Sequence, residues 1–251
     1  MAPALFRGGM INMIKVLSVG GSIVAPAEPD TAFLTAFAAM IRSWLNEDTQ
    51  RRLILVVGGG APARLYQNSY RSVCSLSSAG SGEHSLIQYD NNEADWLGIM
   101  ATRLNAQLLK AVFSDLCADP VVCDPTADFN FTGRILVAAG WKPGFSTDTD
   151  AVYLAERFGA KTVVNLSNIE KVYSADPKTD PDAKPLDDIL WKDFLQMVGE
   201  EWVPGKNCPF DPVASKKADK AGISVICAGG KDINNMLAIL NEKPFFGTLI
   251  H

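Results

Sequence analysis

The chain has 251 residues with a formal net charge of −5, and its 47% hydrophobic and 20% charged content is that of an ordinary globular protein. No basic tract is present, which argues against nucleic-acid binding, and no apolar run reaches the roughly 20 residues that span a bilayer. Five cysteines without a CxxC pair favour reduced thiols in a cytoplasmic protein.

The length suits one large domain, so we treat residues 1–251 as a single unit. The start, MAPALFRGGMINMIKV, has no long apolar segment, which argues against a signal peptide. We expect residues 1–12 to be a leader outside the fold, with Met10 or Met13 as alternative start residues.

Short apolar runs alternate with helical patterns, which predicts βαβ units around a parallel sheet. The first run, 14–19, and the second, 53–57, both end in glycines. Asp30 has the character of a helix N-cap, because apolar residues recur at helical spacing after it. We expect a further helix over 61–72 and, from its Ser and Gly content, a loop over 74–89.

A second N-cap signal stands at Asp90, with Glu93 three residues on as in a capping box. The apolar residues expected to share one face of this helix are Leu97, Ala101, Leu104 and Leu108. Further strands are expected near 111–114, 121–123, 134–139, 161–166 and 223–227, and further helices over 149–158, over 212–221 and from Asp232. The Pro- and Asp-rich stretch 168–188 is predicted to be a long loop, and its length hints at function.

Two glycine clusters follow the first two strands, Gly20-Gly21-Ser22 and Gly58-Gly59-Gly60. Ligands of open α/β sheets bind at the carboxyl ends of strands, and glycine lets backbone N–H groups approach a phosphate closely. Either cluster alone is equally typical of a tight turn. The two together favour phosphate binding, and the absence of GxxxxGK[ST] excludes a P-loop enzyme.

A third cluster, Ser146 to Asp150, supplies hydroxyls and two carboxylates where a helix begins. Capping is the simple explanation for Thr147 and Asp148, and stabilisation of the helix dipole is the simple explanation for Asp150.

Four segments together resemble the amino acid kinase superfamily, and within it the uridylate (UMP) kinases of the archaeal type. They are VxxVGGS, VVGGGxxAR, TDAVxLAxxFGA and SNxxxVYSADPKTDPDAKP, and the resemblance covers residues 14–250. It implies a three-layer α/β/α sandwich around a largely parallel sheet. Residues 13–145 would bind the phosphate acceptor, and residues 146–251 would bind ATP.

The resemblance also implies a role for individual residues. The residues it implies for catalysis are Gly20, Gly21 and Asp150, with Asp150 also the expected ligand of Mg²⁺. Lys142 is added as a nearby candidate cation, and an exposed loop lysine is its alternative. Those expected to bind the acceptor are Ser22, Gly58, Gly59, Gly60, Arg64, Asp95, Gly98 and Thr147. Those expected to bind ATP are Asn168, Tyr173, Asp176, Asp211 and Lys216. A solvated helix face remains the alternative for Asp95, and packing remains the alternative for Tyr173.

The chain departs from these relatives where they carry cations. Ser18 stands where many of them have a lysine before the first glycines, and GGGA replaces GGGK, so Ala61 brings no charge. Glu170-Lys171 replaces Asp-Gly, and the longer STDTDA replaces TTDA. Phosphoryl transfer needs cations around the developing negative charge. Lys142 and Lys216 are the candidates to supply the positive charge that the missing lysines would have brought.

The implied activity is transfer of the γ-phosphoryl of ATP·Mg²⁺ to a nucleoside monophosphate, with UMP as the expected acceptor. Two alternatives stay open: a non-catalytic member that binds nucleotides or stores an oxyanion, and a kinase for another small phosphate or carboxylate. Small nucleotides are the expected partners, together with copies of the chain itself in a homo-oligomer built on dimers, such as a hexamer.

Overall fold

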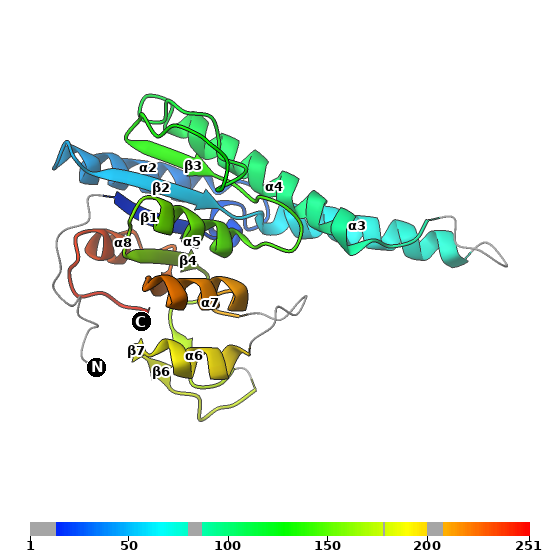
Figure 1. Ribbon diagram of the computed structural model, residues 1–251. Helices are drawn as coiled ribbons and strands as arrows, with labels where there is room; N and C mark the ends of the chain where they lie inside the picture. Colours follow the sequence, from blue (N-terminus) through cyan, green and yellow to red (C-terminus); the bar gives the residue numbers. More distant parts are fainter. Residues whose placement is uncertain (1–13, 80–86, 178, 200–207) are drawn as a thin grey trace.

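The computed structural model describes residues 14–79, 87–177, 179–199 and 208–251. The expected leader, 1–12, and the middle of the predicted Ser/Gly-rich loop, 80–86, lie outside these ranges. In Figure 1 a central sheet carries helices on both faces, and two long helices extend from it as an arm. No helix in the described ranges is long and apolar enough to cross a membrane.

Seven strands form the central sheet in the order β3-β2-β1-β4-β8-β9-β7. Neighbouring strands are parallel except for the antiparallel β8–β9 pair, so the expectation of a largely parallel sheet is confirmed. The strands of this sheet are β1 (Ile14–Val19), β2 (Arg52–Val57), β3 (Ile135–Ala138), β4 (Thr162–Ser167), β7 (Asp188–Ile189), β8 (Ser224–Gly229) and β9 (Thr248–Ile250). A separate antiparallel hairpin joins β5 (Val172–Tyr173) to β6 (Pro185–Leu186).

Helices cover both faces of the sheet, which gives the three layers that the resemblance implies. The helices are α1 (Gly21–Val24), α2 (Thr31–Asn46), α3 (Gly60–Ala79), α4 (Asn91–Val112), α5 (Thr147–Arg157), α6 (Trp191–Val198), α7 (Pro212–Ala221) and α8 (Ile233–Leu240). Successive strand residues point to opposite faces, so Leu17 packs with α2, α4 and α8 whereas Val16 packs with α5, α6 and α7. Burial on both faces explains why the strands are continuous apolar runs.

The local signals placed most elements correctly. The predicted runs 14–19, 53–57, 134–139, 161–166 and 223–227 correspond to β1, β2, β3, β4 and β8. The two predicted N-caps, Asp30 and Asp90, are confirmed, because their side chains accept hydrogen bonds from backbone N–H groups in the first turns of α2 and α4. Asp232, where a helix was expected to begin, caps α8 in the same way.

Four expectations about the first half are wrong. Residues 74–79 continue helix α3, because serine is no helix breaker and α3 packs along α4. Residues 111–114 are no strand, since α4 runs to Val112, and 121–123 contributes only a bridge from Val122 to Ala138. Leu104 does not share a buried face with Ala101, because its side chain is 69% exposed.

The second half holds more structure than the sequence predicted. The stretch 168–188 is no plain loop, because it contains the β5–β6 hairpin and the first residue of β7. Lys171 fastens this hairpin, since its buried ammonium pairs with Asp187 and lies 4.7 Å from the centre of the Phe246 ring. Helices α1 and α6 and strand β9 had no prediction.

The two glycine loops pack directly against each other at the carboxyl ends of β1 and β2. A Cβ on Gly21 would lie 2.6 Å from the Gly60 Cα, and a Cβ on Gly58 would lie 2.5 Å from the Gly21 nitrogen. Gly60 also has a positive φ of 66°, which disfavours any side chain. Close approach of backbone to backbone therefore requires these glycines before any ligand is considered.

We predict that Gly21→Ala destabilises the protein by roughly 3 kcal/mol or more, because its Cβ has no room beside backbone that cannot shift cheaply. Gly222→Ala is the matched control: Gly222 caps α7 with φ 63° in open space, so only backbone strain of about 1 to 2 kcal/mol applies. Urea unfolding measures both variants. Equal losses would contradict the packing explanation.

Candidate functional site

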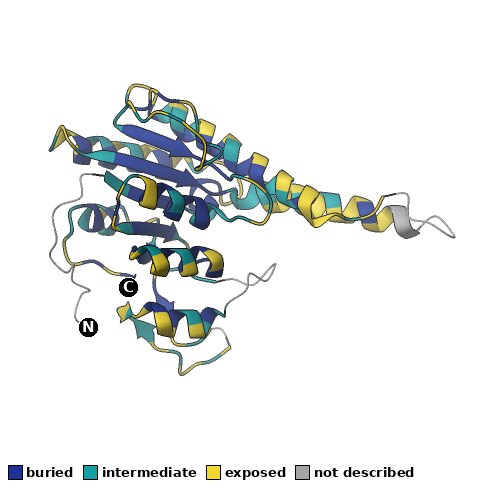
Figure 2. Ribbon diagram, in the orientation of Figure 1, coloured by how far each residue is buried: buried dark blue, intermediate teal, exposed yellow. Residues whose placement is uncertain are grey.

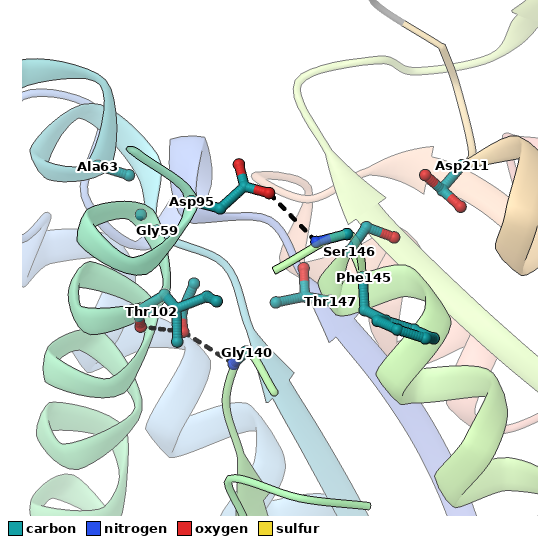
Figure 3. A pocket seen from close by; sticks show the side chains of 12 residues that line it. Gly59, Ala63, Asp95, Thr102, Gly140, Phe145, Ser146, Thr147 and Asp211 are labelled. Carbon is teal, nitrogen blue, oxygen red and sulfur yellow. Dashed lines mark hydrogen bonds between the residues drawn. The ribbon is translucent and has the colours of Figure 1, made fainter. Parts of the chain in front are cut away.

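A cavity of about 250 Å³ opens at the carboxyl ends of the strands, between α4 and the start of α5 (Figure 3). It is lined by Gly59, Ala63, Asp95, Gly98, Ile99, Thr102, Gly140, Gly144, Phe145, Ser146, Thr147 and Asp211. We call it the first cavity. It brings together Gly59, Asp95, Gly98 and Thr147 from the predicted acceptor set, and Asp211 from the predicted ATP set.

Helix α4 supplies one wall of the first cavity, and the loop between β3 and α5 supplies the wall opposite. Asp95 joins the two walls, because its Oδ2 accepts the Gly144 N–H at 3.2 Å (Figure 3). Gly98 lets α3 approach α4, since a Cβ there would lie 2.7 Å from the Gln67 side-chain nitrogen. The solvated-face alternative for Asp95 is therefore not supported: its side chain is partly buried and faces the cavity.

A group of hydrogen-bonded carboxylates lies beside the first cavity at the start of α5. The Ser18 hydroxyl donates to Asp148 Oδ1 at 2.9 Å, and the Asp211 N–H donates to Asp148 Oδ2 at 3.3 Å. Asp211 in turn caps α7 by accepting the Ala214 N–H at 2.8 Å. Ser18, where relatives carry a lysine, therefore orients a carboxylate with a neutral hydroxyl.

The environment of Asp148 favours its protonated form. Burial raises the pKa of Asp148 to about 6, and the negative charge of Asp211 acts in the same direction. The hydrogen bond from Ser18 opposes both effects. A cation brought close to Asp148 by a ligand would favour the ionised form.

Asp150 lies on the other side of α5 and lines neither the first cavity nor a second one at the ends of β1, β4 and β8. Its side chain is 1% exposed, Oδ2 accepts the Trp141 N–H at 3.2 Å, and Oδ1 is buried with no hydrogen-bond partner. Burial raises the pKa of Asp150 to about 7, and the charges of Asp148 and Asp124 add to the rise. The hydrogen bond from the Trp141 N–H acts in the opposite direction. The described residues contain no group of three His, Cys, Asp or Glu side chains that could hold a metal ion.

No lysine or arginine is among the described residues that line the first cavity. Lys15 pairs with Glu242, away from the carboxyl ends of the strands. The Lys142 ammonium lies 3.8 Å from the centre of the Trp141 ring, and Arg64 and Lys216 are exposed on α3 and α7. The structure thus places neither candidate for the missing charge in this cavity.

A second cavity, also of about 250 Å³, lies where β1, β4 and β8 end. Its lining includes Ser22 and Asn168, together with Gly229, Gly230 and Lys231. Of the predicted ATP residues, Tyr173 is partly buried on β5, whereas Asp176 and Lys216 are exposed; none of these three lines either cavity.

Several residues that shape the site were not predicted from the sequence. Thr102 accepts the Gly140 N–H at 2.8 Å and donates to the Ile99 carbonyl, and Arg103 donates to the carbonyls of Gly140 and Trp141. Both lie in the middle of α4, where no local pattern distinguishes them. Ser146 was named only as a hydroxyl near a helix start, and the structure makes it the N-cap of α5.

Comparisons with known proteins, by sequence and by structure, find relatives of one family. The amino acid kinase family matches residues 13–229. A uridylate kinase of Methanospirillum hungatei is 35% identical over 244 residues, covering 94% of this chain and 93% of its own, and one of Pyrococcus abyssi is 31% identical over 233 residues, covering 91% and 95%. The crystal structure of uridylate kinase from Archaeoglobus fulgidus superposes with a TM-score of 0.74 at 29% identity, covering 95% of this chain and 99% of that one.

We predict that Asp150→Asn increases stability more at pH 8 than at pH 5. The pKa of Asp150 is raised, so the folded state keeps a proton that the unfolded chain has lost between about pH 4 and 7. The stability of the parent protein falls as pH rises through that window, and the asparagine variant escapes the fall. The difference between variant and parent in the free energy of unfolding should be about 2 kcal/mol larger at pH 8 than at pH 5.

Urea unfolding at both pH values measures this gap. The matched control is Glu156→Gln on the same helix, whose carboxylate is 52% exposed and pairs with Lys217 at 2.5 Å. It should show no such pH-dependent gain. An Asp150→Asn gap that is equal at the two pH values would contradict the prediction.

Proposed function

The chain belongs to the amino acid kinase family, and we propose on that premise that it transfers the γ-phosphoryl of ATP to UMP. Relatives named uridylate kinase match it over nearly their whole length, which supports this activity. Residues 1–251 would act as one domain, with the acceptor bound mainly by 13–145 and ATP mainly by 146–251.

The observation that carries the proposal is the composition of the first cavity. Three segments far apart in sequence, at Gly59, at Asp95–Gly98 and at Thr147, meet around one space at the carboxyl ends of the strands. A nucleoside monophosphate has ribose hydroxyls, which would donate hydrogen bonds to the Asp95 carboxylate. Its phosphate would lie against the backbone N–H groups at Gly59, where no side chain is in the way. Arg64, close by in sequence on α3, would provide a cation for that phosphate.

ATP would lie over residues 165–176 and 208–216, with Asn168 and Ser22 at the second cavity. The lining there offers a phosphate chain two glycines, hydroxyl and amide side chains and one cation, Lys231, and it also contains two carboxylates, Glu170 and Asp232. Mg²⁺ would accompany the ATP phosphates and neutralise their developing charge. Asp148 and Asp211 are the carboxylates beside the first cavity that would hold it.

Asp148 is better placed than Asp150 for the role at the reacting phosphoryl. Asp148 is tied to Ser18 and to the N-terminus of α7, so it connects the end of β1 with the helix that carries Lys216. Neither carboxylate lines a cavity, but Asp148 accepts the N–H of the cavity residue Asp211, whereas Asp150 is 1% exposed and bonded to Trp141. We therefore move the proposed catalytic and metal role from Asp150 to Asp148, two residues earlier.

The first test is ADP release from ATP·Mg²⁺ with and without UMP. We expect UMP-dependent release, and a fall in kcat of about 100-fold in Asp148→Asn, because loss of a positioned charge at the phosphoryl group costs that order. Asp193→Asn, an exposed carboxylate in the first turn of α6, is the matched control and should be silent. Lys142→Ala tests the remaining lysine: a lower kcat would support a catalytic role, and an unchanged one would end it.

Other outcomes would favour the alternatives. ADP release that depends on a different small phosphate or carboxylate, with UMP inert, would identify a kinase of another acceptor. Tight ATP binding with no release for any acceptor would identify a nucleotide-binding or oxyanion-storing member. The absence of lysine and arginine from the described lining of the first cavity is the feature that keeps this second alternative relevant.

The arm formed by α3 and α4 supports the proposal of a homo-oligomer. Much of the arm is coloured as exposed in Figure 2. Its exposed large apolar residues are Leu65, Tyr66, Val73 and Leu76 on α3 and Trp96, Met100 and Leu104 on α4. Leu65, Val73 and Leu76 recur at helical spacing, so a second copy could bury them as one stripe. We propose a dimer through this arm, as the unit of a larger assembly such as a hexamer, in the cytoplasm, where the five free thiols would stay reduced.

We predict that the double variant Leu65→Asp, Leu76→Asp at least halves the mass of the oligomer. Dimerisation would bury each aspartate without a partner, and the lost solvation would oppose the contact. Light scattering after gel filtration measures the mass. The control is Asn68→Asp, which adds a charge to the same helix at an already exposed polar position. An unchanged mass for the double variant would exclude the arm as the interface.

A further inference from the structure

The loop between β3 and α5 has no regular structure, yet its backbone is held by side chains from two helices. We call residues 140–146 the acceptor loop, because four of its residues, Gly140, Gly144, Phe145 and Ser146, line the first cavity. The position of this loop therefore sets the width of the cavity.

One peptide group of the acceptor loop is gripped at both ends, by the guanidinium of Arg103 and by the carboxyl group of Asp150. The carbonyl of Gly140 accepts from Arg103 Nε at 3.3 Å, and the N–H of Trp141, in the same peptide group, donates to Asp150 Oδ2 at 3.2 Å. Arg103 Nη2 also donates to the Trp141 carbonyl at 2.9 Å. Hydrogen bonds to charged groups are stronger than neutral ones, so this grip fixes the loop firmly.

The preceding amide is held as well. Thr102 accepts the Gly140 N–H at 2.8 Å, and Gly140 has no space for a side chain, since a Cβ would lie 2.9 Å from the Thr102 hydroxyl oxygen. Thr102, Arg103 and Asp150 thus act on two consecutive peptide groups, and we call these three residues the loop clasp.

The burial of Asp150 needs a reason other than stability. Its second carboxylate oxygen has no partner, and leaving such an atom buried is costly. Helix α5 is already capped by Ser146 and carries Asp148 in its first turn, so the helix dipole does not require another carboxylate. Arg103 is the cation near Asp150, whereas Asp148 and Asp124 repel it.

We infer that Arg103 and Asp150 are positioning residues for the acceptor: they hold the Gly140–Trp141 peptide, and with it one wall of the first cavity, in the geometry that receives the nucleoside monophosphate. The inference rests on the proposed function for the identity of that acceptor. Neither residue lines the cavity, so both act through the acceptor loop.

Arg103→Lys is the first test, because lysine keeps the charge but loses the fork that reaches two carbonyls. We expect the KM for UMP to rise about tenfold, as the loss of one charge-assisted hydrogen bond predicts, with the KM for ATP and kcat at saturating UMP within about twofold. Arg42→Lys is the matched control, since Arg42 likewise donates to a carbonyl, that of Val112, far from the cavity. It should leave both KM values unchanged.

Asp150→Asn and Asp150→Ala form a graded second test. Asparagine keeps an oxygen that can accept the Trp141 N–H, so we expect a rise of about threefold in the KM for UMP, and alanine should cost about tenfold. Glu156→Gln is the acid-to-amide control. A merely structural role predicts that UMP binding weakens only as the free energy of unfolding falls, whereas the clasp predicts weaker UMP binding in an Asp150→Asn protein whose free energy of unfolding matches that of the parent.

Hydrogen exchange provides a readout that needs no turnover. The amides of Gly140 and Trp141 should lose protection in Arg103→Lys and Asp150→Ala and keep it in Arg42→Lys. The clasp is overturned if protection is unchanged, or if the parent protein phosphorylates UMP and both variants bind UMP, measured by calorimetry, within about twofold of it. A parent protein inert towards UMP would overturn the proposed function instead, and hydrogen exchange alone would then decide on the clasp.

Discussion

The backbone contact between Gly21 and Gly60 is the constraint on which the site depends. Because β1 and β2 pair in parallel with Val19 opposite Val57, both chains reach the edge of the sheet at the same level. Each must turn there against the other, and a side chain on either would overlap backbone. The turn after Gly60 directs α3, α3 packs along α4, and α4 presents Asp95, Gly98 and Thr102 to the first cavity. Of the glycines at this contact, Gly59 lines the first cavity, where its backbone could contact a phosphate.

Much of the fold could be predicted because its signals are local. A buried strand is an apolar run, and an N-cap such as Asp30 acts within three residues of itself. The failures mark where tertiary contacts decide. Nothing in the serines of 74–79 says that α3 continues until its packing against α4 is known. Apolar spacing also places Leu104 on a buried face, but an amphipathic pattern cannot tell the protein core from an exposed apolar surface on a projecting arm.

The candidate site was predictable only in part, for the same reason. Motif matches found Gly59, Asp95, Gly98, Thr147 and Asp211, which all reach the first cavity. They assigned the catalytic and metal role to Asp150, and nothing local to the sequence favours Asp148, which begins the same helix two residues earlier. Residues two apart on a helix point about 200° apart around its axis, so one carboxylate meets Ser18 and the other meets Trp141. Only the packing of α5 on the sheet decides which of the two carboxylates contacts Asp211, a residue of the first cavity.

Asp150 shows how a protein keeps a residue that works against its stability. The isolated carboxylate is unfavourable where it lies, because burial and two neighbouring carboxylates oppose its charge. Arg103 compensates it through the peptide group between them, which accepts from one charge and donates to the other. A neutral pair could fill the same space without fixing that peptide in one orientation. Stability and acceptor-site geometry therefore make opposite demands at this position.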